Sequence, residues 1–268
     1  MDIIQAIALA ILQGLTEFLP ISSSAHLMLL PILVGWEDQG LAFDVAVHIG
    51  TLTAVIIFYR RDLIQISQSW GKSLCGGESN EDSKLAWYVL LGTIPVGLVG
   101  ISLPDSVEEM IRSPIVVAIA TIIFAILLWF AEKKATEKRD TITLMDAIVV
   151  GLFQAIALIP GTSRSGITIT AGLLTGLKRE HAARFSFLLS IPVISLAGML
   201  KSYELYQTIE PVNWEFMAIG ACISALVAYL SIAWFLKFLN KVGMMPFVYY
   251  RFALGIFLLW LFNPFLSI

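Results

Sequence analysis

Long apolar stretches separated by short polar interruptions run the whole length of the chain. The apolar segments fall at about 2–19, 22–34, 43–59, 85–103, 114–131, 145–159, 162–177, 185–200, 214–236 and 247–266. Six of them, at 43–59, 85–103, 114–131, 185–200, 214–236 and 247–266, are near the roughly 17–25 residues that a helix needs to cross a bilayer. Since helices satisfy their own backbone hydrogen bonds in lipid, the pattern predicts an all-α polytopic membrane protein with six transmembrane helices.

Two of the remaining segments, 22–34 and 162–177, are too short to cross easily. Each follows another apolar helix, 2–19 or 145–159, across a break that contains a proline. Such pairs are typical of re-entrant helical hairpins, which enter the membrane and return to the same side.

The two halves of the chain resemble each other. Gln13 comes seven residues before Pro20, and Gln154 comes six residues before Pro160. Each proline is followed by small and hydroxyl residues and then by a short apolar helix. The pattern of a hairpin followed by three spans therefore occurs twice in the chain.

Because three crossings is an odd number, the second copy must enter the membrane from the opposite side. We therefore expect an inverted repeat, with the functional site where its two copies meet. The prediction is one integral membrane domain over 1–268, with repeat one at about 1–131 and repeat two at about 144–268.

Composition supports a membrane protein. Hydrophobic residues make up 58% of the chain and charged residues 14%, and the mean hydropathy is +0.85. A soluble domain carries about 25% charged residues. The net charge of −3 does not point to nucleic acid, and we expect no nucleic-acid partner.

The basic residues predict the orientation. If the hairpins do not cross, thirteen lysines and arginines fall on the side opposite the N-terminus: Arg60, Arg61, Lys72, Lys84, Lys133, Lys134, Lys138, Arg139, Lys178, Arg179, Arg184, Lys237 and Lys241. Only Arg112 and Lys201 fall on the N-terminal side. Cytoplasmic loops are enriched in Lys and Arg, so both termini are expected outside. Of the longer polar loops, 60–84 is expected to be a flexible connector and 104–113 an outer loop with an interfacial helix.

The first polar break carries acid–base chemistry. Gln13 and Glu17 are four residues apart and would share one face of a helix. Ser22 and Ser23 follow Pro20, where a new helix must begin, and a serine there can cap free backbone N–H groups. His26 lies three residues beyond Ser23, again on one face.

The second break carries a positive charge. Gly161 allows a close approach of the backbone, and Ser163, Arg164 and Ser165 stand at the start of a helix that continues to Thr168. An arginine at the bilayer midplane costs about 2.5–3.5 kcal/mol even on the lenient insertion scale, so Arg164 is expected to be functional.

Two helix N-termini, an arginine and hydroxyl donors aimed at one cavity would form an anion site. The planar fork of an arginine suits phosphate, and a nearby carboxylate supplies a general base or a metal ligand. His26 could act as acid, base or nucleophile. The set is typical of phosphoryl transfer rather than passive binding.

Each feature also has a purely structural interpretation. The serines could be helix caps, His26 could bond a neighbouring carbonyl, and Glu17 could lie near an interface. We favour the structural interpretation for Asp44 and His48, which lie in the first turns of a span. Arg251 is predicted to snorkel to a membrane surface.

These motifs resemble those of the undecaprenyl-diphosphate phosphatase family, also called the bacitracin-resistance family. Its Glu/Gln-x-x-x-Glu motif is matched from Gln13 to Glu17, followed by Pro20-Ile21-Ser22-Ser23 and His26. Its Pro-Gly-x-Ser-Arg-Ser-x-x-Thr motif is matched without departure at 160–168. The resemblance covers essentially the full chain, including Phe185-Ser186-Phe187-Leu188-Leu189 and Tyr250-Arg251-Phe252.

The resemblance implies an enzyme that hydrolyses a C55 polyprenyl diphosphate to the monophosphate carrier of cell-wall synthesis, and so confers bacitracin resistance. It implies catalytic roles for Glu17, Ser23, His26 and Arg164, and a substrate-binding shell of Gln13, Ser22, Gly161, Ser163, Ser165 and Thr168. It further implies a divalent cation, Mg²⁺ or Ca²⁺. Our hypothesis is that Glu17, alone or with Gln13, holds this metal or positions the nucleophile. The expected location is the bacterial plasma (inner) membrane, with an active site that opens outward; a homodimer is suggested by analogy alone.

The nucleophile stays open between Ser23, His26 and water, and either His26 or Glu17 would take a proton from Ser23. The alternative function is a polyprenyl-phosphate transporter or flippase, since inverted repeats with broken helices also build transporters. Glu17 together with His26 favours the enzyme, because an anion carrier gains little from a carboxylate beside the phosphate.

Overall fold

The fold is described from a computed structural model, which covers residues 1–111, 113–135, 139–207 and 213–262. Over these residues the secondary structure is helical, apart from one isolated bridge between Arg139 and Leu177. The helices are α1 (Ile3–Thr16), α2 (Ser23–Val34), α3 (Gly40–Phe58), α4 (Arg60–Leu74), α5 (Glu81–Ser102), α6 (Asp105–Ile111), α7 (Pro114–Lys134), α8 (Leu144–Ile156), α9 (Arg164–Leu174), α10 (Arg179–Gln207), α11 (Trp214–Val242) and α12 (Met245–Leu261).

Five of the described helices, α3, α5, α7, α10 and α11, are long and apolar enough to cross a membrane. The sixth predicted span corresponds to α12, which has 17 residues and so lies at the short end of the range for a crossing helix. The prediction of an all-α polytopic membrane protein is confirmed. Its predicted repeat arrangement stays a prediction.

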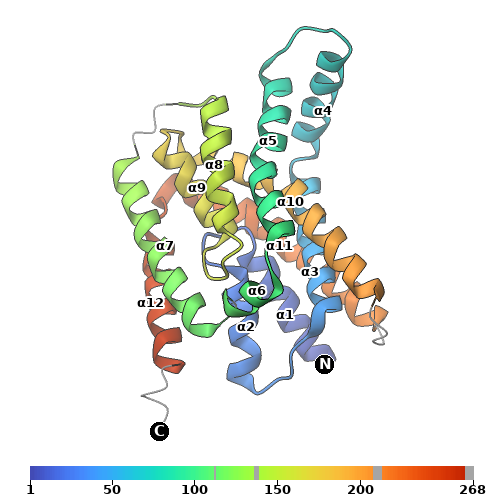
Figure 1. The fold of residues 1–268 in the computed structure, drawn as a ribbon, viewed down its shortest axis with the longest axis vertical. Helices are drawn as coiled ribbons and strands as arrows, with labels where there is room; N and C mark the ends of the chain where they lie inside the picture. Colours follow the sequence, from blue (N-terminus) through green and yellow to red (C-terminus); the bar gives the residue numbers. More distant parts are fainter. Residues whose placement is uncertain (112, 136–138, 208–212, 263–268) are drawn as a thin grey trace.

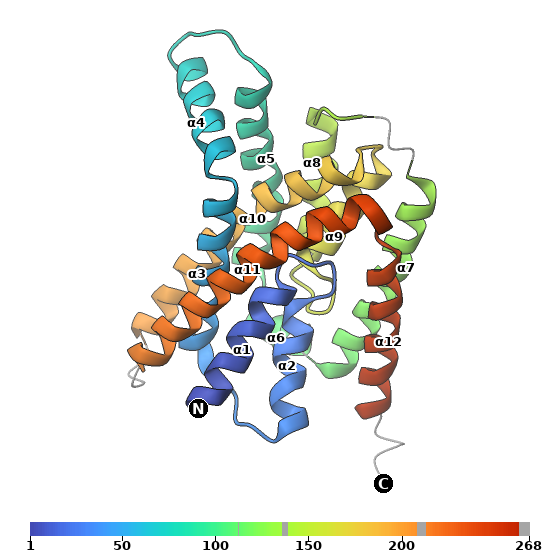
Figure 2. The same ribbon diagram turned by 180° about the vertical axis from the view of Figure 1, so that it is seen from behind.

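The short helices pair into two hairpins that enter from opposite ends of the molecule. Helix α1 begins and α2 finishes on the side of the molecule where the N-terminus lies, whereas α8 begins and α9 finishes on the opposite side (Figure 1, Figure 2). Their turns meet in the middle, where the Ser165 hydroxyl donates to the Leu19 carbonyl at 2.9 Å. The centre of the molecule is thus formed by two non-helical turns that come from distant parts of the chain.

The two hairpins share an unusual backbone feature. Ser22 and Ser163 precede α2 and α9, and their φ angles are 72° and 68°. They are the only non-glycine residues with positive φ in the described part of the chain. Positive φ is energetically unfavourable for any residue that has a β-carbon, and residues in such conformations cluster at functional sites. Ser163 Oγ accepts from the Gly166 amide at 3.2 Å as an N-cap, but Ser22 makes no side-chain cap, contrary to prediction.

The hairpins are held by the long helices around them. α1 packs on α11, α8 on α5, and α9 lies between α7 and α10. A β-carbon added at Gly151 of α8 would lie 2.7 Å from the Gly92 Cα of α5, so these helices are in backbone contact. Gly161 has φ of 91°, and a β-carbon there would lie 2.3 Å from the Val117 carbonyl of α7. Larger residues are therefore excluded at both points.

The polar loops differ in part from expectation. The predicted flexible connector 60–84 is wrong for most of its length, because α4 occupies residues 60–74 and packs along α5. Helix α4 is polar and buries a single side chain, Ile66. The expected helix in 104–113 is present as α6. Arg112 and Lys138, both used in the charge count, lie outside the described residues, as does the end of the predicted segment 247–266.

Candidate active site

Glu17 is the centre of a polar cluster at the meeting point of the hairpins. Its amide donates to the Gln13 carbonyl at 3.0 Å, which continues the helical geometry of α1 and puts both side chains on one face. Glu17 Oε2 accepts from Gln13 Nε2 at 3.0 Å and from Ser23 Oγ at 2.8 Å. The residue is only 9% exposed, so its carboxylate depends on these donors and on a counter-charge.

Arg164 supplies that counter-charge from the other hairpin. Its Nη2 donates to Glu17 Oε1 at 2.8 Å across 147 residues of sequence. Nη1 donates to the Ser186 carbonyl at 3.3 Å, and the guanidinium carbon lies 5.8 Å from the centre of the Phe18 ring. Arg164 begins α9, so its charge adds to the positive end of that helix dipole.

The hydroxyls expected around the substrate are mostly bonded within the protein. Ser165 donates to Leu19, and Ser22 Oγ lies 3.1 Å from Ser24 Oγ. Thr168 donates to the Arg164 carbonyl at 2.8 Å and lies 2.7 Å from Ser186 Oγ. In this conformation these groups shape the cluster, and Ser23 is the hydroxyl that contacts the carboxylate.

His26 faces away from that cluster. Its Nδ1 lies 2.7 Å from the Ser22 carbonyl, so Nδ1 carries the proton and Nε2 accepts from the Tyr250 hydroxyl of α12. The two rings are nearly parallel, at an angle of 6°. The geometry places Glu17, and not His26, against Ser23. Local sequence patterns do not identify Tyr250 as a partner of His26, because the contact spans 224 residues.

His48, to which we assigned a structural role, lies beside Glu17. Its Nε2 is 3.9 Å from Glu17 Oε2, while its Nδ1 is 2.7 Å from the Asp44 carbonyl. The i, i+4 spacing of Asp44 and His48 pointed only to a contact within α3. It did not show that this face of α3 looks onto the turn of the first hairpin.

The prediction that Arg251 snorkels to a membrane surface is wrong. Its side chain is fully buried, and it donates to the Gly161 carbonyl at 2.9 Å and to the Thr121 carbonyl at 3.3 Å. The prediction assumed a place near the end of a span. Helix α12 instead begins at Met245, so Arg251 lies almost two turns inside the helix, on the face that meets the second hairpin.

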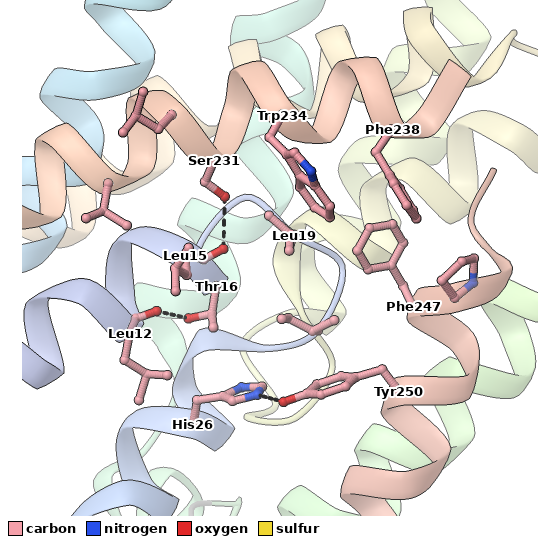
Figure 3. Close-up of a pocket in the computed structure, with 14 residues that line it drawn as sticks. Leu12, Leu15, Thr16, Leu19, His26, Ser231, Trp234, Phe238, Phe247 and Tyr250 are labelled. Carbon is pink, nitrogen blue, oxygen red and sulfur yellow. Dashed lines mark hydrogen bonds between the residues drawn. The ribbon is translucent and has the colours of Figure 1, made fainter. Parts of the chain in front are cut away.

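An apolar groove of about 680 Å³ runs beside the first hairpin (Figure 3). Its walls come from α1, α11, α12 and the hairpin turn, and include Leu15, Leu19, Leu230, Trp234, Phe247 and Tyr250. Leu15, Leu230 and Trp234 are exposed on the outer surface of the protein. His26 and Tyr250 also line the groove, so it reaches from the outer surface of the protein to the start of α2.

A divalent cation would find few protein ligands here. No group of three or more His, Cys, Asp or Glu side chains suited to a metal occurs within the described residues. The buried Gln13 Oε1, however, has no hydrogen-bond partner in the described part of the chain, and it belongs to the amide that donates to Glu17. One carboxylate with one amide oxygen fits Mg²⁺, which binds through one or two carboxylates while substrate phosphates and waters complete its shell.

Comparison with known proteins gives consistent matches over nearly the whole chain. The family model for bacitracin resistance protein BacA matches residues 6–257. An undecaprenyl-diphosphatase of Nitrosococcus oceani is 57% identical over 265 residues, covering 98% of this chain and 100% of that protein. Undecaprenyl-diphosphatase 2 of Stutzerimonas stutzeri is 54% identical, and the match covers 98% of this chain and 99% of that protein. The undecaprenyl-diphosphatase of Saccharophagus degradans is 53% identical, and the match covers 95% of this chain and 96% of that protein.

Proposed function

Since this chain belongs to the bacitracin resistance protein family, we propose that it hydrolyses undecaprenyl diphosphate to undecaprenyl phosphate and inorganic phosphate. It is a multi-pass membrane phosphatase, and its product is the lipid carrier reused in cell-wall synthesis. The observation that carries the site assignment is the chain of contacts from Ser23 through Glu17 to Arg164. These contacts unite a hydroxyl, a base and a phosphate-binding cation from both hairpins.

The geometry supports Ser23 as nucleophile and Glu17 as its base. The Ser23 hydroxyl already donates to Glu17 Oε2 at 2.8 Å, which is the approach needed for proton transfer. Ser23 Oγ would attack the terminal phosphorus while its proton passes to Glu17, and undecaprenyl phosphate would leave. Water would then hydrolyse the phosphoserine and release inorganic phosphate.

Arg164 would hold the phosphate and offset negative charge in the transition state. Its Nη2 donates to Glu17 Oε1, so the two charges offset each other in this conformation. A phosphate oxygen would take over the guanidinium, and the positive ends of α2 and α9 would add to the field. The released carboxylate would then be the stronger base toward Ser23.

The apolar groove is suited to the polyprenyl chain. Its outer wall is open to lipid along Leu230 and Trp234, so the tail can enter sideways without leaving the membrane. The part of the groove lined by His26 lies next to Ser22 and Ser23, where the diphosphate would turn toward Arg164. His26 would therefore sit between the tail and the reacting phosphate.

Mg²⁺ or Ca²⁺ stays part of the proposal, with Glu17 and the free Gln13 Oε1 as its protein ligands. Such a cation supplies charge neutralisation at the phosphate oxygens when it is bound.

The topology is also a proposal. The left-handed serines that precede α2 and α9, and the opposite entry of the two hairpins, support an inverted repeat. The excess of Lys and Arg away from the N-terminal side supports termini outside. An active site that opens outward rests on the family resemblance. A homodimer rests on analogy.

The test is the release of inorganic phosphate from a C55 polyprenyl diphosphate by the detergent-purified chain. Detergent removes the two compartments that a flippase needs but leaves hydrolysis intact. Turnover establishes the phosphatase. Its absence, together with lipid movement across reconstituted vesicles, would favour the transporter.

Ser23→Ala tests the nucleophile in the same assay. A loss of about 10³-fold or more in kcat, with a radioactive phosphoserine trapped by acid quench in the unaltered chain, is expected. Full turnover by Ser23→Ala would leave a Glu17-activated water as the nucleophile.

A further inference from the structure

Arg251 is a buried cation without a carboxylate partner. It is the largest fully buried side chain of the described residues, and none of the ion pairs found among them includes it. Removing a charge from water costs several kcal/mol, and an incompletely paired ion recovers only part of that cost. The retention of an arginine here therefore needs an explanation other than stability.

Its hydrogen bonds converge on the turn of the second hairpin. Nη2 donates to the Gly161 carbonyl at 2.9 Å, and Nε donates to the Thr121 carbonyl of α7 at 3.3 Å. The Thr121 hydroxyl also lies within 3.3 Å of the Gly161 carbonyl. Gly161 itself is left-handed and stands three residues before Arg164. Helices α7 and α12 thus fix the same carbonyl at the point where the backbone turns toward α9.

The third arm of the guanidinium lies over the first turn of α9. Nη1 has no hydrogen-bond partner among the described residues. A β-carbon built on Gly166 would approach Nη1 to 2.8 Å and Ser163 Oγ to 3.1 Å. Gly166 therefore leaves the space that Arg251 fills, and the guanidinium packs against the helical turn that begins at Arg164.

We propose that Arg251 is a positioning residue for Arg164. By holding the Gly161 carbonyl and packing on the first turn of α9, it keeps Ser163 in its strained conformation and directs Arg164 toward Glu17 and the diphosphate. The preceding residue, Tyr250, donates to His26 of the first hairpin, so adjacent residues of α12 contact both hairpins. This inference rests on the proposed phosphatase function.

The test uses Arg251→Met, Arg251→Lys and Arg251→Ala in the full-length, detergent-purified chain. A displacement of about 1 Å at a reacting group can cost 10²-fold in rate. We expect kcat per folded molecule to fall about 100-fold in Arg251→Met, with KM changed less than about threefold. Arg251→Lys keeps the charge but not the planar fork, and should recover only part of the loss. Guanidinium added to Arg251→Ala should raise kcat at least tenfold.

Gly166→Ala displaces the same guanidinium without altering Arg251. It should reproduce the fall in kcat, whereas Gly198→Ala, where an added β-carbon has no atom within 4 Å, should not. It also keeps the idea testable if Arg251→Met does not fold.

Either of two results would overturn the positioning role. One is unaltered kcat in Arg251→Met or, should it not fold, in Gly166→Ala. The other is a fall in activity that, in every variant, is fully explained by a smaller folded fraction and is not restored by guanidinium. If the unaltered chain releases no phosphate, the proposed function fails and this role with it. If that chain turns over and the variants match it, only the role of Arg251 fails.

Discussion

The ion pair between Glu17 and Arg164 allows stability and catalysis to be separated by a double-mutant cycle. The two side chains are 8% and 12% exposed, and their closest atoms are 2.8 Å apart. Arg164→Met leaves a buried carboxylate without its counter-charge, and Glu17→Gln leaves a buried guanidinium. Removing one partner of a buried pair costs about 3–5 kcal/mol, whereas replacing both by neutral groups is often tolerated.

We therefore expect thermal stability and turnover to respond differently to the double substitution. Each single variant should lower the thermal midpoint by roughly 10 °C, given ~2–4 °C per kcal/mol for a chain of this size. The double variant Glu17→Gln/Arg164→Met should regain most of that loss. Turnover should stay about 10³-fold or more below the unaltered chain in all three, because both groups act on the reacting atoms.

Thermal unfolding in detergent and phosphate release from a C55 diphosphate provide the two measurements. The pair Arg184 and Asp62 is the control, since it has a similar 2.8 Å contact but is about one-third exposed. Replacing either of these residues should cost no more than about 1 kcal/mol and leave turnover intact. Single variants as stable as the unaltered chain, or a double variant whose turnover approaches that of the unaltered chain, would refute the reasoning.

Three further expectations follow from the packing, the groove and the cation ligands. Gly151→Ala should destabilise the protein by ~1–3 kcal/mol, because its β-carbon would lie 2.7 Å from the backbone of α5. Gly97→Ala, where an added β-carbon has no atom within 4 Å, should not, and equal thermal midpoints for the two variants would contradict the close contact. Trp234→Ala should raise KM for the C55 substrate about tenfold, equivalent to ~1.4 kcal/mol, but not for a C15 diphosphate. Trp260→Ala is the control, because Trp260 is exposed and lies outside the groove. Equal effects of Trp234→Ala on both chain lengths would exclude the groove as the tail site. A chelator should abolish phosphate release. Gln13→Leu should raise about tenfold the Mg²⁺ concentration needed for half-maximal binding, measured by calorimetry. Unchanged Mg²⁺ binding by this variant would exclude Gln13 as a ligand.

The sequence predicted the features that depend on local pattern. Both hairpins are visible in the short apolar lengths on either side of Pro20 and Pro160, and both turns carry the polar residues that meet in the structure. The sequence could not predict α4, since a polar helix on the outside of a bundle has a composition much like that of a loop. The length of α10 was underestimated for a related reason, because the polar residues on either side of the expected span 185–200, such as Arg179, were assigned to loops.

Contacts between distant helices were beyond such reasoning. The spacing of Asp44 and His48 shows that they share a face of α3, but not that this face looks onto Glu17. For Arg251, hydropathy shows a charge in an apolar segment, but only the tertiary packing shows that the face carrying it meets Gly161. Long-range partners of this kind depend on how the helices are arranged in space.

The large separation of Glu17 and Arg164 along the chain has a consequence for biosynthesis. At ~5–20 residues per second, the ribosome needs roughly 7 to 30 s to add the 147 residues between them. During that interval the first hairpin has Glu17 without the Arg164 guanidinium that pairs with it. The reaction centre is completed only when the second half of the polypeptide has been inserted.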